Sequence, residues 1–234
     1  MKTISIPFHD RIAAGRALAA ALDAYRDRRD VLVLALPRGG VPVATEVAAA
    51  LGADIDLIIV RKLGVPGHSE LAMGAIASGG IRVLNQHIIS SLGIRDSEIE
   101  EVAKNEAREL ERREHAYRGV RPRPAIKGKC VILVDDGVAT GATMRAAIEA
   151  LRHQKPERIV VAVPVAPPDT VSRLRGEADE VVCLTSPETF WAIGQWYIEF
   201  PQLPDEAVRE GLARVWDGRL QSSRTNAARA DSHA

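Results

Sequence analysis

Five short segments of the chain are almost entirely apolar, and segments with a helical pattern lie between them. A continuous apolar run, in contrast to an alternating one, is typical of a strand that is buried on both faces. Such strands occur in parallel sheets that helices cover on each side. The pattern therefore predicts a doubly wound α/β fold with a mostly parallel sheet. The predicted strands are Val31–Leu36, Ile55–Val60, Cys130–Val134, Arg158–Val163 and Glu180–Leu184.

Weaker signals predict a hairpin and four helices around these strands. Ser78-Gly79-Gly80 is typical of a hairpin turn and indicates short strands over Ala72–Ala77 and Ile81–Leu84. Caps, first-turn prolines and terminal glycines mark the ends of helices. The expected helices run from a cap at Asp10 to Tyr25, over Val41–Leu51, from a Ser97–Glu100 capping box through a long charged segment, and over Met144–His153.

The charge and hydropathy of the chain limit its possible partners. Lys and Arg number 31 and Asp and Glu number 31, so the formal net charge is zero. A protein that grips nucleic acid through a general basic field usually carries excess positive charge, so nucleic acid is not the expected partner. The sequence contains no apolar run long enough to span a membrane, and its first ten residues lack the apolar stretch of a secretory signal. We expect a cytoplasmic protein.

The most informative segment follows the third long apolar run. Two acids, Asp135 and Asp136, stand at its end, and a loop of small residues leads from them into the next helix. A helix N-terminus presents unpaired backbone N–H groups, and small residues allow an anion to approach them closely. Threonine hydroxyls add further donors. The loop is therefore a candidate phosphate cradle, made of Ala139, Thr140, Gly141, Ala142 and Thr143.

The two acids need a ligand of their own, because adjacent carboxylates repel each other and are costly to bury without donors. A ribose that carries a phosphate would satisfy both halves of the segment, with its hydroxyls on Asp135 and Asp136 and its phosphate on the loop. The segment is not a P-loop, because its glycine spacing differs and no lysine precedes a Ser or Thr. A solvated acidic turn followed by an ordinary helix cap is the simpler alternative.

These residues resemble the signature of the type I phosphoribosyltransferases, which is an apolar run, two acids and a loop that ends in Thr-Gly-x-Thr. Val131-Ile-Leu-Val134, Asp135-Asp136 and Thr140-Gly-Ala-Thr143 match it, and the resemblance extends over most of Val31–Leu184. Gly137 departs from the pattern, because the family usually carries a larger aliphatic residue there. The resemblance implies binding of phosphoribosyl pyrophosphate (PRPP), with Mg²⁺ held mainly by substrate and water. It is also consistent with a homodimer, which is common in the family.

The resemblance also assigns roles to two other loops. It implies a pyrophosphate-binding loop, often with a cis peptide, at Arg38-Gly39-Gly40, and further pyrophosphate contacts from Arg61 or Lys62. It implies a flexible lid across about Leu63–Ser78. His68 and Glu70 lie within that lid, where a solvated role is the simpler reading. The residues expected to act in catalysis are Asp135, Asp136, Arg61 and Lys62.

The composition changes near residue 185, where aromatic residues become frequent. The resemblance implies a small C-terminal hood over the acceptor, and flat side chains there could stack on a base. Trp191 and Trp196 are the candidates, although the hood's own core explains most of its aromatics. We therefore expect a core over 1–184, a hood over 185–218 and a flexible tail over 219–234.

Together these features predict a phosphoribosyltransferase of nucleotide metabolism that moves the phosphoribosyl group from PRPP to a nitrogen acceptor. A PRPP-binding regulator without catalysis, built on the same fold, is the main alternative. A phosphoacceptor receiver domain also places acids at strand ends, usually nearer its N-terminus, but would leave the Thr-Gly-Ala-Thr loop unexplained. The sequence does not name the acceptor.

Overall fold

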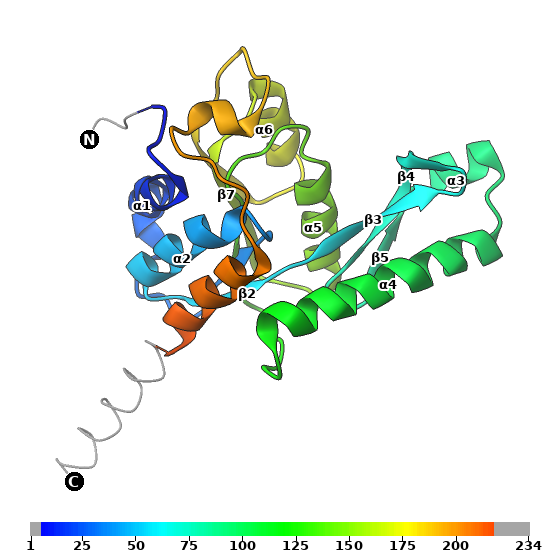
Figure 1. The fold of residues 1–234 in the computed structure, drawn as a ribbon, viewed down its shortest axis with the longest axis horizontal. Coiled ribbons are helices and arrows are strands. Elements are labelled where there is room, and N and C mark those ends of the chain that lie inside the picture. The colour runs from blue at the N-terminus through cyan, green and yellow to red at the C-terminus, as the bar shows by residue number, and fades with distance from the viewer. Residues whose placement is uncertain (1–5, 218–234) are drawn as a thin grey trace, which may run out of the picture.

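The computed structural model describes residues 6–217, and a five-stranded parallel sheet forms its centre (Figure 1). The strand order is β2-β1-β6-β7-β8, and each neighbouring pair is parallel. All five long apolar segments form these strands, so the predicted doubly wound fold is confirmed. The strands are β1 (Val31–Ala35), β2 (Asp54–Leu57), β6 (Cys130–Val134), β7 (Arg158–Val165) and β8 (Glu180–Thr185).

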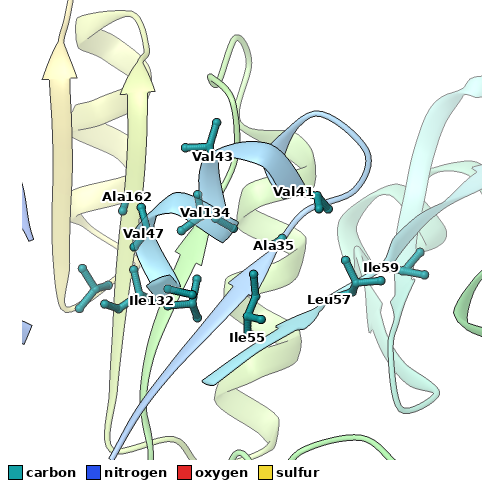
Figure 2. Close-up of a cluster of buried hydrophobic side chains, with 14 of the residues drawn as sticks. Ala35, Val41, Val43, Val47, Ile55, Leu57, Ile59, Ile132, Val134 and Ala162 are labelled. Atoms are coloured by element: carbon teal, nitrogen blue, oxygen red, sulfur yellow. The ribbon is translucent and has the colours of Figure 1, made fainter. Parts of the chain in front are cut away.

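Helices cover both faces of this sheet, and each face has its own apolar core. Successive strand residues point to opposite faces, so Val33 and Ile132 pack into one core, whereas Leu34 and Leu133 pack into the other. Figure 2 shows part of the first of these cores, with Val43 of the covering helix near Val134 and Val47 near Ile132. The first core includes side chains of α1 (Arg11–Ala21), the short 3-10 helix η1 (Asp23–Tyr25), α2 (Gly40–Leu51) and the helix over 205–217; the second includes those of α5 (Ala142–His153) and α6 (Pro168–Arg175).

Residues 60–118 form an arm that extends to one side of the central sheet (Figure 1). The arm contains a three-stranded antiparallel sheet in the order β3-β4-β5. The predicted hairpin turn is confirmed, because Gly79 and Gly80 join β4 to β5 with the positive φ angles that glycine tolerates. The elements of the arm are β3 (Val60–Val65), β4 (His68–Ala77), β5 (Ile81–Leu84), α3 (Gln86–Leu92) and α4 (Asp96–Arg118).

Two expectations about the arm were wrong. The segment expected to be a hinged loop, about 63–78, forms two antiparallel strands that are paired from Val60↔Ala77 to Val65↔His68, with register shifts on both sides of Gly64. Gly67, with φ at 77°, closes a tight turn between them. The capping box of α4 uses Arg95 and Glu98, with the Glu98 carboxylate accepting from the Arg95 N–H at 3.0 Å, and not Ser97 and Glu100.

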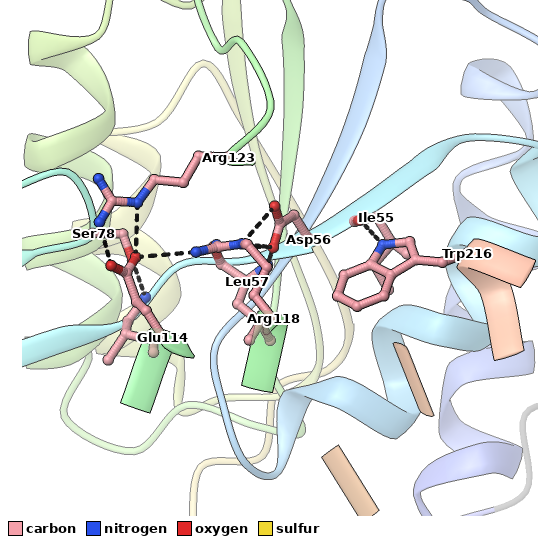
Figure 3. Close-up of polar contacts among 9 residues, drawn as sticks. Ile55, Asp56, Leu57, Ser78, Glu114, Arg118, Arg123 and Trp216 are labelled. Atoms are coloured by element: carbon pink, nitrogen blue, oxygen red, sulfur yellow. Dashed lines mark hydrogen bonds and ion pairs between the residues drawn. The ribbon is translucent and has the colours of Figure 1, made fainter. Parts of the chain in front are cut away.

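A buried ionic cluster joins the arm to the central sheet, as Figure 3 shows. Arg118, in the last turn of α4, donates from Nη2 to Asp56 Oδ1 of β2 at 2.9 Å and lies 3.4 Å from Glu114 Oε1. Glu114 is also paired with Arg123, which follows α4. The cluster therefore holds the C-terminal end of α4 against the strand that leads into the arm.

The predicted hood region contains the 3-10 helix η2 (Ile193–Trp196) and the helix over 205–217. The chain near the N-terminus pairs with it, because Phe8 N–H donates to the Trp196 carbonyl and Ile198 N–H donates to the Phe8 carbonyl, each at 2.8 Å. The boundary between core and hood stays a prediction, and the expected tail lies outside the described residues. No helix among residues 6–217 is long and apolar enough to cross a membrane.

Candidate functional site

The candidate site lies where β1 and β6, neighbours at the centre of the sheet, end side by side. Ala35 is paired with Val134, so the loops that follow the two strands leave the same edge together. Ligands of doubly wound sheets bind beyond this carboxyl edge. The first loop carries Arg38, Gly39 and Gly40, and the second carries the acidic pair. The Pro37–Arg38 peptide bond is cis, as the resemblance implied.

Both glycines of the first loop lie against the second loop. A Cβ atom on Gly39 would fall 2.1 Å from Asp136 Oδ2, and a Cβ on Gly40 would fall 2.7 Å from the Val134 carbonyl oxygen. Neither position has room for a side chain. The two loops, separate ligand-binding segments in the sequence, are therefore in direct contact in the structure.

We expect Gly39→Ala to disturb the site by overpacking. The backbone angles of Gly39, φ −59° and ψ −37°, suit alanine, so any effect comes from the collision with Asp136. Overpacking of this kind typically costs about 1–3 kcal/mol. A urea titration should therefore show a lower free energy of unfolding. An unchanged value would mean that the two loops are farther apart than described.

The two acids of the pair have different surroundings. Asp135 lines a pocket together with the small-residue loop. Asp136 is buried, only 6% exposed, and its Oδ2 accepts from Arg11 Nε at 2.7 Å. The two are linked because the Asp136 backbone N–H donates to Asp135 Oδ1 at 2.8 Å. The pair is therefore split into one acid that faces the pocket and one that is held inside the protein.

Burial shifts the ionisation of this cluster. It raises the pKa of Asp135 well above its usual value, and the neighbouring charge of Asp136 raises it further. Burial also raises the pKa of Asp136, against the opposing effect of the Arg11 guanidinium. Burial raises the pKa of Tyr197 too, so this hydroxyl stays protonated and donates to the Asp136 carbonyl at 2.5 Å.

The small-residue loop and Asp135 enclose a pocket of about 200 Å³. Gly141 stands at the N-terminus of α5 with φ at 80°, a conformation that favours glycine. Thr170 of α6 holds the loop from behind, since its hydroxyl donates to the Ala139 carbonyl at 2.7 Å. Thr140 and Thr143 are exposed. The described lining residues are Asp135, Gly137, Val138, Ala139, Thr140, Gly141, Ala142, Thr143, Met144 and Ile193.

Gly137, where a larger aliphatic residue was expected, lies against a side chain of the hood. A Cβ on Gly137 would fall 2.7 Å from Ile193 Cγ2 and 3.1 Å from Val165 Cγ1. Ile193 therefore occupies the space beside Gly137 in which a larger side chain would lie. The same isoleucine lines the pocket, so the hood contributes an apolar wall to the site.

The three cationic side chains that were expected to bind pyrophosphate lie in different places. Arg38, half exposed, is 3.7 Å from Asp205. Arg61 and Lys62 belong to β3 and point to opposite faces of the arm. Arg61 is paired with Glu106 of α4 at 2.6 Å, whereas Lys62 lines a second pocket, of about 380 Å³, between the arm and α5. Thr143 lines both pockets, so the pocket that Lys62 lines adjoins the small-residue loop.

The tryptophans chosen from the sequence do not line the pocket beside the acids. Trp191 is 86% exposed. Trp196 stacks on Phe190 with ring centroids 6.4 Å apart, and its Nε1 atom is buried without a hydrogen-bond partner among the described residues. Their role in acceptor binding stays a prediction. His68 and Glu70 are exposed, and Glu70 lies 3.5 Å from Lys62.

Three residues near the acids, Arg11, Tyr197 and Ile193, are missing from the sequence-based site. Arg11 precedes Gly15 by four residues and Leu18 by seven, so it lies on the buried stripe of α1. A cation on an apolar stripe is a signal that could have revealed it. No comparable signal marks Tyr197 or Ile193, because their contacts depend on how the hood packs.

A doubly wound sheet with an acidic pair and a small-residue loop at its carboxyl edge defines the class of this protein. The family model described as the phosphoribosyl transferase domain matches residues 8–200, and the chain belongs to this family. It is 46% identical over 208 residues to "Putative phosphoribosyl transferase Rv0571c" of Mycobacterium tuberculosis, a match that covers 89% of this chain and 47% of that protein. The chain thus spans about half the length of the curated relatives that it matches.

A solved structure has a similar fold. The crystal structure of TT1426 from Thermus thermophilus is 46% identical in sequence, with a TM-score of 0.79. The match covers 88% of this chain and 98% of that one. The similarity therefore extends over most of this chain and nearly all of the other.

Proposed function

We propose that this chain binds PRPP with Mg²⁺ and transfers its phosphoribosyl group to a nitrogen acceptor, with release of pyrophosphate. The observation that carries the proposal is the pocket that Asp135 shares with the small-residue loop. A carboxylate accepts hydrogen bonds from hydroxyls, and backbone N–H groups at a helix N-terminus donate to phosphate. A sugar phosphate has both groups in one molecule.

Each part of PRPP has a counterpart in the site. Ribose hydroxyls would donate to Asp135, while Asp136 would support that carboxylate from behind. The 5′-phosphate would lie on Ala139–Thr143. The pyrophosphate would extend toward the other loops, with donors from the Gly39 backbone and from Arg38 and Lys62. The Gly40 N–H donates to the Leu36 carbonyl at 3.1 Å, so Gly40 would contribute space and not a donor. Arg61 would have to leave Glu106 to contribute.

The site fits Mg²⁺ as a companion of the substrate. Mg²⁺ in proteins usually keeps several waters and binds one or two carboxylates together with substrate phosphates. Asp135 is the acid that lines the pocket, and PRPP would bring the phosphate oxygens. The ion would supply positive charge against the leaving pyrophosphate.

The reaction would break the bond between ribose C1 and the pyrophosphate oxygen and form a bond between C1 and the acceptor nitrogen. The bonding electrons leave with pyrophosphate, and the acceptor nitrogen loses a proton when it carries one. Positive charge develops on the ribose ring as the bond breaks. Catalysis would therefore come from positioning and from fixed charges near the leaving group.

Titration calorimetry with PRPP, with and without Mg²⁺, tests binding, and an acceptor panel with pyrophosphate detection tests transfer. We expect saturable PRPP binding that Mg²⁺ strengthens, and pyrophosphate release with at least one purine, pyrimidine or related base. Tight binding without turnover across the panel would support the regulator, and absence of binding would overturn both. The acceptor, participation in nucleotide metabolism, a homodimer and a cytoplasmic location remain predictions.

We expect Thr140→Val to weaken PRPP binding by about 1–3 kcal/mol, which is about 5- to 150-fold, because a phosphate oxygen would lose one donor. Thr140 is exposed, so the fold should be unaffected. Thr45→Val is a matched control, because the Thr45 hydroxyl donates to the Pro42 carbonyl within α2. Equal affinities of the two variants in calorimetry would argue against the phosphate cradle.

A further inference from the structure

Arg11 reaches the acidic pair from the first turn of α1, 125 residues earlier in the chain. Its Nε donates to Asp136 Oδ2 at 2.7 Å, and each side chain is only 9% exposed. A buried ion pair contributes little net stability, because desolvation of both charges offsets their attraction. The position of this pair beside the pocket suggests a purpose other than stability.

The remaining contacts of Arg11 are with the hood. Its Nη1 donates to the Pro201 carbonyl at 2.9 Å, and its guanidinium carbon lies 3.7 Å from the centroid of the Phe200 ring. Tyr197, from the same segment, donates to the Asp136 carbonyl. The hood is thus attached to Asp136 at two points, and Arg11 provides one of them.

Asp136 is fixed while Asp135 is left to the pocket. Arg11 holds the Asp136 carboxylate, and Gly39 packs against the same oxygen. Asp135, not Asp136, is the acid of the pair that lines the pocket. The next residue, Gly137, is in turn covered by Ile193 of the hood.

We propose that Arg11 is a positioning residue of the PRPP site, which holds Asp136 away from the pocket, leaves Asp135 to meet the sugar, and seats the hood over Gly137. This inference rests on the proposed function. Loss of Arg11 would leave two adjacent acids without their counter-charge beside an anionic ligand. PRPP binding would then weaken.

Arg11 is the cation among the groups that face Asp136. The others are Asp135 from its own loop, Tyr197 from the hood and Gly39 from the loop after β1. Loss of Arg11 would therefore remove the counter-charge that holds the Asp136 carboxylate in place.

The experiment measures PRPP affinity and melting temperature for wild type, Arg11→Met, Arg11→Gln and Arg11→Lys. We expect Met and Gln to weaken binding about tenfold or more. Lys keeps the charge and should recover most of the affinity. Arg16→Met is the matched control, because Arg16 lies on the same helix in an exposed pair with Glu46.

The outcomes separate this inference from the proposed function. If wild type binds PRPP and the neutral variants keep its affinity, the role of Arg11 is overturned while the function stands. A loss of affinity that Arg11→Lys shares in full, or that Arg16→Met shares, would also overturn it as a merely structural effect. Wild type that does not bind PRPP overturns the function itself. Should Arg11→Met fail to fold, the Gln and Lys variants carry the comparison.

Discussion

Asp135→Asn is expected to weaken PRPP binding about 100-fold or more and, at the same time, to raise the melting temperature of the ligand-free protein. The carboxylate can accept two charge-assisted hydrogen bonds from the sugar, each worth about 1.5–3 kcal/mol, whereas the amide offers one acceptor oxygen and no charge. The amide oxygen can keep the bond from the Asp136 N–H. Loss of binding would therefore not come from loss of the fold.

The expected rise in the melting temperature of Asp135→Asn depends on pH. Burial raises the pKa of Asp135 in the folded protein well above its usual value of 3.8. A carboxyl with a raised pKa binds its proton more tightly when folded, so ionising it lowers the free energy of unfolding as the pH rises through this interval. Asparagine removes that cost. The difference in melting temperature should be present near neutral pH and disappear below about pH 4, where Asp135 is protonated in both states.

Asp136→Asn is the matched comparison, because it removes the other charge of the pair. Arg11 would lose its ionised partner while remaining buried. Burial raises the pKa of Asp136 as it does that of Asp135, but Arg11 opposes the shift and would be left without its ionised partner. Asp136→Asn should therefore gain less melting temperature than Asp135→Asn. A clear difference between the two neighbouring substitutions would support the split environment, and equal shifts would contradict it.

Arg118→Met is expected to lower the free energy of unfolding by about 3–5 kcal/mol, because it leaves two buried carboxylates without their shared cation. The Arg118 side chain is only 5% exposed and contacts Asp56, Glu114 and the Leu57 carbonyl (Figure 3). Methionine has a similar length but supplies no donor. A denaturant titration at neutral pH measures the loss.

The cluster around Arg118 also predicts how this loss changes with pH. Burial raises the pKa of Asp56, although Arg118 opposes the shift. Without Arg118 the pKa should rise further, so the variant loses stability more steeply than wild type as the pH increases. Its deficit should be smallest in acid, where Asp56 is neutral. A deficit that grows toward acid pH would contradict the cluster as described.

Arg112→Met provides the control for this substitution. Arg112 lies on the same helix, α4, and is paired with Glu109 on the surface. Exposed ion pairs contribute little to stability, so the variant should unfold close to wild type. The difference between the Arg118 and Arg112 variants bears on function, because Arg118 anchors β2. This strand leads into the arm that carries Lys62.

The sequence by itself determined the central architecture and the candidate phosphate cradle. Continuous apolar runs such as Cys130–Val134 have few alternatives to a strand that is covered on both faces. The acids and the small-residue loop are contiguous, so their proximity needs no knowledge of the fold. For the same reason, local turn signals were sufficient to predict the hairpin at Ser78-Gly79-Gly80.

Only the tertiary structure decided which acid faces the pocket, where the cations point and which hood residue meets the site. No local sequence feature distinguishes Asp135 from Asp136. Arg11, Tyr197 and Gly39 distinguish them through contacts between segments that are 61 to 125 residues apart. Residues 63–78, expected to form a flexible lid, form paired strands because pairing between β3 and β4 satisfies their backbone N–H and C=O groups. Contacts between distant segments depend on how whole elements pack, and a local pattern contains no information about that packing.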